Sequence, residues 1–107
     1  MNFEIIATPN FKKEAKNLSK KYTSLRTELP ELIEQLIINP EMGTALGDNI
    51  YKIRLAIKSK GKGKSGGARV ITFLKIIASK VYLVSIYDKS EKENLSDKEL
   101  KNMIKDL

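Results

Sequence analysis

The hydrophobic residues change their spacing halfway along this chain, and that change constrains the fold more than any other feature. Before residue 50, apolar residues recur every three or four positions, which is the spacing that buries one face of a helix. Between residues 50 and 87 they form short runs rich in β-branched and aromatic residues, as strands do. The chain has 107 residues, too few for two domains, so we expect one α+β domain over residues 1–107 with a largely antiparallel sheet.

The chain begins with a predicted strand and a helix. Residues 2–8 are a short apolar run that ends at a turn signal. Thr8 followed by Pro9 marks a helix start, with a capping hydroxyl and then a proline at the first helical position. We expect this helix to end near Lys21. Its predicted apolar face consists of Phe11, Ala15, Leu18 and Tyr22.

A second helix is predicted to follow directly. Thr23 or Ser24 can cap it, and Pro30 predicts a kink or a late start because proline lacks a backbone donor. Its predicted buried stripe consists of Leu25, Leu29, Leu32, Ile33, Leu36 and Ile37. Residues 39–49 contain two glycines and a proline, so we expect a loop there.

Three strands and a final helix are predicted in the second half. The strands cover residues 50–57, 68–76 and 80–87, and a short turn at residues 78–79 makes the last two an antiparallel hairpin. Ser96 and Glu99 have the spacing of a capping box, which predicts a helix after them. Leu95 and Leu100 are placed to staple this helix, whose predicted apolar face consists of Leu100, Met103, Ile104 and Leu107.

Composition excludes several classes of function. The chain has no cysteine and no histidine, so thiolate chemistry, disulfides and the usual acid–base residue near neutral pH are absent. A formal charge of +7 favours a polyanionic partner. The N-terminus lacks the pattern of a signal peptide, and no apolar run approaches the roughly 20 residues that span a bilayer. We therefore expect a cytoplasmic protein without a membrane partner.

The stretch KSKGKGKSGGAR, residues 58–69, holds four lysines, one arginine, four glycines and no acidic residue. Its GKS end resembles that of a phosphate-binding P-loop, but Lys58 stands where the first glycine should be. A strand is also predicted where a P-loop would open a helix. Two readings remain open: a loop that grips a nucleic-acid backbone, or a flexible connection between two strands.

Nearly the whole chain resembles the RelE/HigB family of bacterial type II toxins, specifically from about residue 50 to 95 and more loosely elsewhere. The resemblance is carried by KIRLAIKSKGKGKSGGARVITF, then VYLVSIYDKSEKENL, then the capped helix, and is nearest to the HigB branch. It implies the RelE-like fold, with two N-terminal helices packed on the sheet and a C-terminal helix. It also implies a ribosome-dependent mRNA endonuclease without metal or cofactor, held by a cognate antitoxin protein in a hetero-oligomer. The implied partners are the antitoxin, the ribosome and mRNA.

The resemblance also implies a site made of basic residues and a tyrosine on the exposed face of the sheet. The positions that match as catalytic are Arg54, Lys64, Arg69 and Tyr87. Those that match as RNA-binding are Lys52, Lys58, Lys60, Lys62 and Lys89. The choice of the catalytic lysine among those of the loop is left open.

These residue types suit cleavage of RNA by its own 2′-hydroxyl. Two guanidinium groups can stabilise the phosphorane, Tyr87 or a lysine can act as base, and Arg69 or a loop lysine can serve the leaving group. These residues also have purely structural interpretations. Arg54 and Lys52 could be ordinary surface residues of a strand, and Tyr87 could be a tyrosine at the edge of the core. Side chains alternate between the two faces of a strand, so Arg69 should lie on the same face as Ile71 and Phe73. Either both faces of the sheet are partly apolar, or Arg69 stands before the regular pairing of the strand begins.

Two other functions fit the sequence less well. ParE-type proteins have the same fold and act by binding DNA gyrase, but they usually lack the basic and tyrosine cluster. A plain RNA- or ribosome-binding module would display stacking aromatics, whereas aromatic residues make up 7% of this chain and mostly follow core patterns.

Overall fold

A computed structural model of the chain describes residues 3–60, 66–91 and 94–107. The elements are β1 (Glu4–Ala7), α1 (Pro9–Lys21), α2 (Leu25–Ile38), β2 (Thr44–Gly47), β3 (Ile50–Leu55), η1 (Lys58–Lys60), β4 (Ala68–Lys75), η2 (Ile76–Ala78), β5 (Lys80–Asp88) and α4 (Asp97–Ile104), where η marks a short 3₁₀ helix. None of the helices in this described part has both the length and the apolar character that crossing a bilayer requires.

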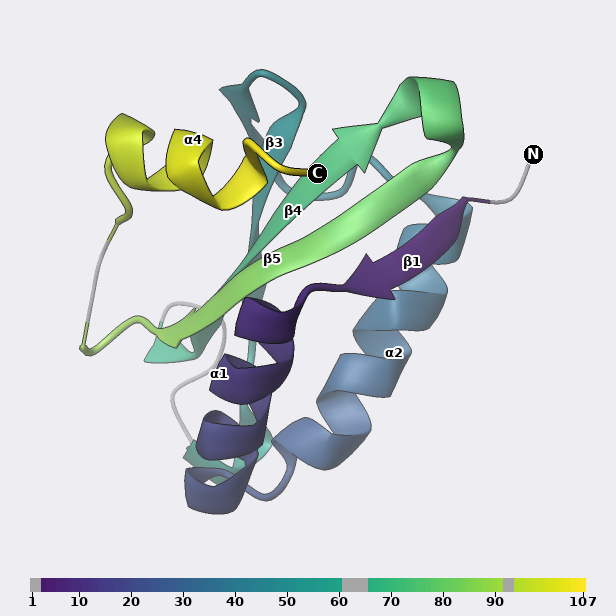
Figure 1. The fold of residues 1–107 in the computed structure, drawn as a ribbon. Coiled ribbons are helices and arrows are strands. Elements are labelled where there is room, and N and C mark those ends of the chain that lie inside the picture. Colours follow the sequence, from purple (N-terminus) through teal and green to yellow (C-terminus); the bar gives the residue numbers. More distant parts are fainter. Residues whose placement is uncertain (1–2, 61–65, 92–93) are drawn as a thin grey trace.

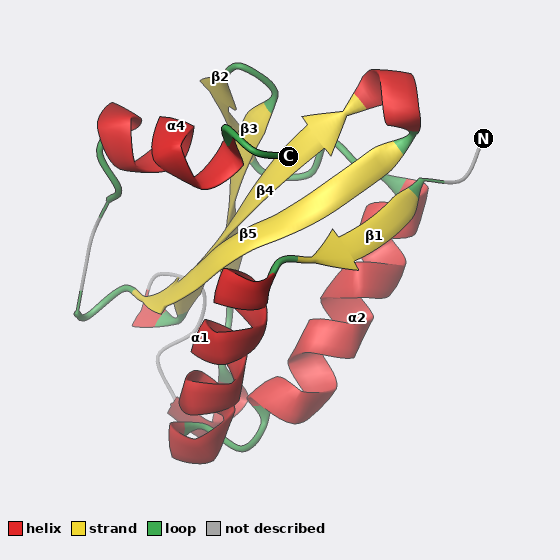
Figure 2. Ribbon diagram, in the orientation of Figure 1, coloured by secondary structure: helices red, strands yellow, loops and turns green. Residues whose placement is uncertain are grey.

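The five strands form one sheet in the order β1-β5-β4-β3-β2. β1 joins β5 in parallel, and every other pair is antiparallel. Helices α1 and α2 lie against one face of the sheet, and α4 lies against the other (Figures 1 and 2). The predicted fold is therefore confirmed: an α+β structure with a largely antiparallel sheet, two N-terminal helices packed on it and a C-terminal helix.

Each face of the sheet carries its own hydrophobic core. The larger core joins α1 and α2 to the sheet, and its buried residues are Phe11, Leu25, Leu32, Leu36, Ile53, Ile57, Ala68, Val70, Leu83 and Ile86. The smaller core lies under α4, and its buried residues are Ile50, Ile71, Val84, Tyr87 and Leu100. Both faces are thus partly apolar, which explains why Arg69 can share a face with Ile71 and Phe73.

The starts of the two N-terminal helices differ. Thr8 accepts a hydrogen bond from the Phe11 backbone N–H at 3.2 Å and Pro9 is the first helical residue, as predicted. Ser24 stands before the second helix, but its hydroxyl makes no capping bond and instead donates to Glu28 Oε1 at 3.1 Å. The late start that Pro30 suggested is wrong, because α2 begins at Leu25 and runs past the proline.

The predicted loop over residues 39–49 is wrong in part, because it contains the edge strand β2. Asp48 and Asn49, which join β2 to β3, have φ values of 52° and 62°. Positive φ at both central residues is what a type I′ hairpin turn requires, and Asp and Asn tolerate it better than most residues. The strand itself is four residues long and exposed throughout, so it carries no apolar pattern.

The final helix begins as predicted. Ser96 Oγ accepts a hydrogen bond from the Glu99 N–H at 3.1 Å, and Glu99 Oε1 accepts one from the Ser96 N–H at 3.1 Å. Leu95 and Leu100 both pack into the smaller core, which fixes α4 against the sheet.

Candidate functional site

Three of the predicted site residues form one row across the middle strands of the sheet. Arg54 of β3 pairs with Arg69 of β4, and Arg69 pairs with Tyr87 of β5. Directly paired residues of antiparallel strands lie on the same face, with Cβ atoms about 4.5–5.5 Å apart. Two like charges in such a pair destabilise a sheet, so this row is better suited to binding an anion than to stabilising the fold.

A β-bulge places Tyr87 in this row. Ile71 pairs with Ser85 and Thr72 with Leu83, so Val84 of β5 has no partner in the ladder. Strict alternation along β5 would put Tyr87 on the opposite face from Val84, yet both belong to the core under α4. The extra residue therefore turns Tyr87 towards the face that carries the two arginines.

The three side chains of the row differ in exposure. Arg54 is exposed, whereas Arg69 and Tyr87 are 3% and 6% exposed, so two of the three side chains of the row are covered. Arg69 Nη1 donates to the carbonyl of Ala68 at 3.1 Å, which helps to hold the guanidinium. Burial raises the pKa of the Tyr87 hydroxyl above its ordinary value, and the charge of Arg69, which acts in the opposite direction, does not offset it.

A cationic pocket opens beside this row. Its volume is about 210 Å³, and it is lined by Lys52, Arg54, Arg69, Lys89 and Asn94. Four of these five side chains are positively charged and none is acidic. Lys52 Nζ donates to Asn94 Oδ1 at 2.9 Å. Guanidinium and ammonium groups that converge in this way form a site for phosphate oxygens.

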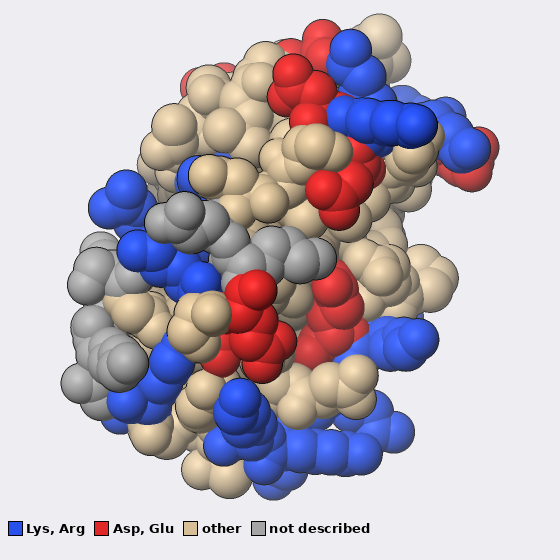
Figure 3. Space-filling model, turned by 90° about the vertical axis from the view of Figure 1, so that its left-hand side faces the viewer, with Lys and Arg blue, Asp and Glu red and all other residues tan. Residues whose placement is uncertain are grey.

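Charged side chains of both signs lie on the face of the molecule seen in Figure 3. Lysine and arginine side chains lie along its left and lower edges and also on its right, while acidic side chains lie near the centre and towards the top. Positive charge on this face is therefore not confined to one side.

Lys60, which was predicted to bind RNA, is engaged elsewhere. Its Nζ forms an ion pair with the carboxylate of Asp88, and the two side chains are 8% and 0% exposed. Asp88 also accepts hydrogen bonds from the Tyr22 hydroxyl at 2.9 Å and from Ser90. Burial alone would raise the pKa of Asp88, but the bonds from Lys60, Ser90 and Tyr22 outweigh it and hold the pKa well below its usual range. Lys60 thus ties the start of the basic loop to the end of β5.

The other lysines of the loop border a different pocket or fall outside the described residues. Lys58 is exposed, and its backbone N–H donates to Glu28 Oε2 at 2.8 Å. It borders a pocket that is also lined by Glu28, Glu31 and Arg54. Lys62 and Lys64 fall outside the described residues.

Gly67 and Asn94 are two site residues whose roles the sequence did not indicate. A Cβ built on Gly67 would overlap the carbonyl oxygen of Leu55, so the glycine allows β4 to approach β3 where Arg54 and Arg69 pair. Asn94 lines the cationic pocket, but a single asparagine in a polar stretch carries no pattern that would single it out. Only the three-dimensional arrangement brings it to the site.

Comparison with known proteins matches this fold and this chain to one family. Residues 4–106 match the family model described as the RelE toxin of the RelE/RelB toxin–antitoxin system. An E. coli RelE mutant in the free state is 18% identical, with a TM-score of 0.63 over 87% of this chain and 90% of that one.

Two further solved structures have the same fold. The intact E. coli RelBE toxin–antitoxin complex matches at 17% identity and a TM-score of 0.61, over 80% of this chain and 95% of that one. The E. coli RelE mutant in complex with an antitoxin RelBc peptide matches at 19% identity and a TM-score of 0.61, over 89% and 100% of the two chains. Because the family model covers nearly the whole sequence, this chain belongs to the RelE toxin family.

Proposed function

We propose that this protein is the toxin of a type II toxin–antitoxin system and stops translation by cutting mRNA on the ribosome, as RelE/HigB-type endonucleases do. The observation that carries the proposal is the row formed by Arg54, Arg69 and Tyr87 beside a pocket with four positive charges. A gyrase poison has no need of such a row. A module that only binds RNA has no need of a buried tyrosine beside two arginines.

In this proposal the scissile phosphate lies between the two arginines. The 2′-hydroxyl oxygen of the RNA attacks phosphorus, and the bond from phosphorus to the 5′ oxygen breaks. Arg54 and Arg69 carry permanent charges and bind phosphate oxygens through planar forks, so they suit the charge that develops on the phosphorane. The products are a 2′,3′-cyclic phosphate and a 5′-hydroxyl.

Tyr87 is better suited to give a proton than to take one. Its raised pKa disfavours the tyrosinate form that a base would need, so in this proposal the protonated hydroxyl donates to the departing 5′ oxygen. Removal of the 2′ proton then falls to a lysine of the basic cluster. No metal or cofactor is needed for these steps.

We further propose an antitoxin protein as the cognate partner, in a hetero-oligomer formed in the cytoplasm. The support is that two of the similar structures are of E. coli RelE with its antitoxin, or with a peptide of it. In this proposal the free protein meets mRNA on the ribosome, and the antitoxin keeps it away.

Primer extension on mRNA after brief induction tests the reaction and the site together. We expect cuts at positions in register with codons for the wild type. Arg69→Ala and Tyr87→Phe should cut about 100-fold or more slowly, because each removes a group that acts on the transition state. Arg54→Ala should do the same.

Matched substitutions outside the site serve as controls. Arg26→Ala changes an exposed arginine of α2, and Tyr82→Phe changes a tyrosine that stacks on Phe73, with ring centroids 6.3 Å apart. Both should cut at the wild-type rate. Intact mRNA together with DNA-damage signalling would point to the gyrase mechanism, and RNA that is bound but never shortened would point to a binding module.

A further inference from the structure

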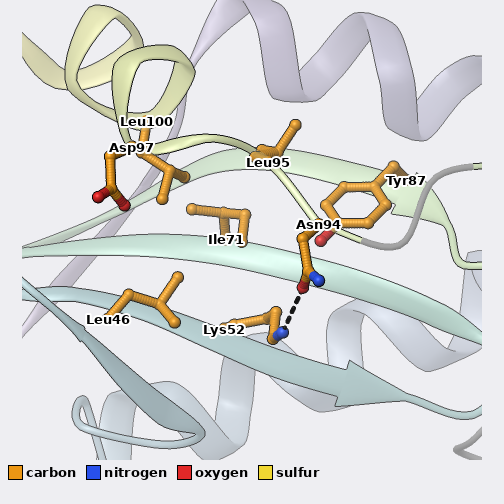
Figure 4. Close-up of a pocket in the computed structure, with 8 residues that line it drawn as sticks. All are labelled: Leu46, Lys52, Ile71, Tyr87, Asn94, Leu95, Asp97 and Leu100. Atoms are coloured by element: carbon orange, nitrogen blue, oxygen red, sulfur yellow. Dashed lines mark hydrogen bonds between the residues drawn. The ribbon is translucent and has the colours of Figure 1, made fainter.

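A second pocket lies between α4 and the sheet, next to the cationic pocket (Figure 4). We propose that it holds the base of a nucleotide whose phosphate occupies the cationic pocket, and that it favours a base with an exocyclic amino group over uracil. The proposal rests on the proposed function and adds a subsite that selects the sequence to be cut.

The two pockets are adjacent and share two lining residues. Lys52 and Asn94 line both, and Figure 4 shows the hydrogen bond between them. A ligand that occupies both must therefore have an anionic part joined to an uncharged part within a few bond lengths. A nucleotide has this composition, whereas inorganic phosphate or an apolar molecule would fill only one pocket.

The second pocket has the size and the lining for a ring. Its volume is about 140 Å³, well below the roughly 300–1,000 Å³ typical of pockets for larger ligands. Ile71 and Leu100 are buried and form its apolar floor, and Leu46 and Leu95 border it from the two sides. Leu46 is 38% exposed, so a stacked base would cover an apolar side chain that faces solvent.

Asp97 gives the pocket a preference among bases. It is the first residue of α4 and lines the end of the pocket that is far from Tyr87. An ionised carboxylate only accepts hydrogen bonds, so the base edge that faces it must donate. Adenine and cytosine carry a donating amino group at the position where uracil, like thymine, has an accepting carbonyl.

Methyl NMR spectra of the full chain, labelled at its isoleucine and leucine methyl groups, test the subsite without any cleavage. The probes are cytidine 5′-monophosphate, uridine 5′-monophosphate and inorganic phosphate. We expect the cytidine nucleotide to shift the methyl signals of Leu46, Ile71 and Leu95, and the uridine nucleotide to bind about fivefold more weakly. Inorganic phosphate should shift only the side-chain signals of Arg54 and Arg69. These arginine signals are recorded in a second sample, which is labelled with nitrogen-15.

Asp97→Asn tests the origin of the preference, because an amide can donate to the uracil carbonyl. The ratio of the two nucleotide affinities should fall to about one or reverse. Asp106→Asn makes the same change of charge at an exposed carboxylate that lines neither pocket, and it should keep the wild-type ratio.

The outcomes separate this subsite from the proposed function. If phosphate and both nucleotides shift the arginine signals but leave the three methyl groups unmoved, the base subsite is wrong and the phosphate site stands. Equal affinities for the two nucleotides in the wild type would also overturn the preference. If none of the three probes moves the arginine signals, the phosphate site and the subsite both fail.

Discussion

At the scale of single residues, Lys60 stands in a run of alternating lysines and glycines but differs from Lys89 in its surroundings. Lys60 is paired with Asp88 inside the protein, whereas Lys89 lines the cationic pocket. The same substitution at the two positions should therefore have different effects.

Lys60→Ala should lower the free energy of unfolding by about 3–5 kcal/mol, because it leaves the buried carboxylate of Asp88 without its cation. Lys89→Ala should change it by about 0.5 kcal/mol or less. Denaturant titration measures both. A Lys60→Ala variant as stable as the wild type would show that the pair does not hold the loop.

The same pair predicts how stability depends on pH. The pKa of Asp88 is lower in the folded protein than in the unfolded chain, so the folded state binds fewer protons and stability rises with pH between the two values. This contribution should be complete above the unfolded pKa of about 4 and be lost as the pH falls below it. Asp88→Asn should flatten this part of a plot of unfolding free energy against pH, and Asp106→Asn should not.

At the scale of elements, the close pairing of β3 with β4 depends on Gly67. Gly67→Ala should lower the free energy of unfolding by about 1–3 kcal/mol, because the new Cβ would overlap the Leu55 carbonyl and force the two strands apart. Gly47→Ala meets no atom within 4 Å, although its φ of 92° adds some strain. Thermal unfolding of the two variants should show the larger loss at Gly67, and the reverse order would mean that close strand approach is not what matters there.

Most elements were predictable because their signals are local. Thr8 with Pro9, and Ser96 with Glu99, mark helix starts through bonds to residues three positions away. β2 was missed because an exposed edge strand of four residues has no buried face to impose an alternation. The bulge at Val84 could not be predicted either, since it shows only when β5 is aligned with β4.

For the site, the candidate residues came from motif and resemblance, but their arrangement did not. The row formed by Arg54, Arg69 and Tyr87 requires strand register and the bulge, which are properties of pairing between distant segments. Lys60 looks identical to its neighbouring lysines in sequence, and only the position of Asp88 distinguishes it.

At the scale of the whole molecule, a net charge of +7 is expected to draw the protein to RNA of any sequence. Only charges at the site should contribute strongly to the salt dependence of that binding. Arg54→Ala combined with Lys89→Ala should reduce the slope of log affinity against log salt by about 1.4, taking roughly 0.7 for each phosphate contact with a single strand.

Lys12→Ala combined with Lys16→Ala removes the same charge from exposed positions of α1 and should leave that slope nearly unchanged. Fluorescence anisotropy with a labelled single-stranded RNA measures both slopes. Equal reductions for the two double variants would mean that RNA is held by the overall charge and not by the cationic pocket.

The uneven exposure of the row has a practical consequence for anyone who must produce this protein in living cells. Tyr87 belongs to the smaller core, and Arg69 is covered, so removing either whole side chain also removes packing, and a folding measurement must accompany such a variant. Arg54 is exposed to solvent on β3, and the pairing of that strand does not depend on its side chain. The proposed function therefore predicts that a form which no longer cuts mRNA but keeps its shape, and with it any surface that a partner binds, is best sought at Arg54.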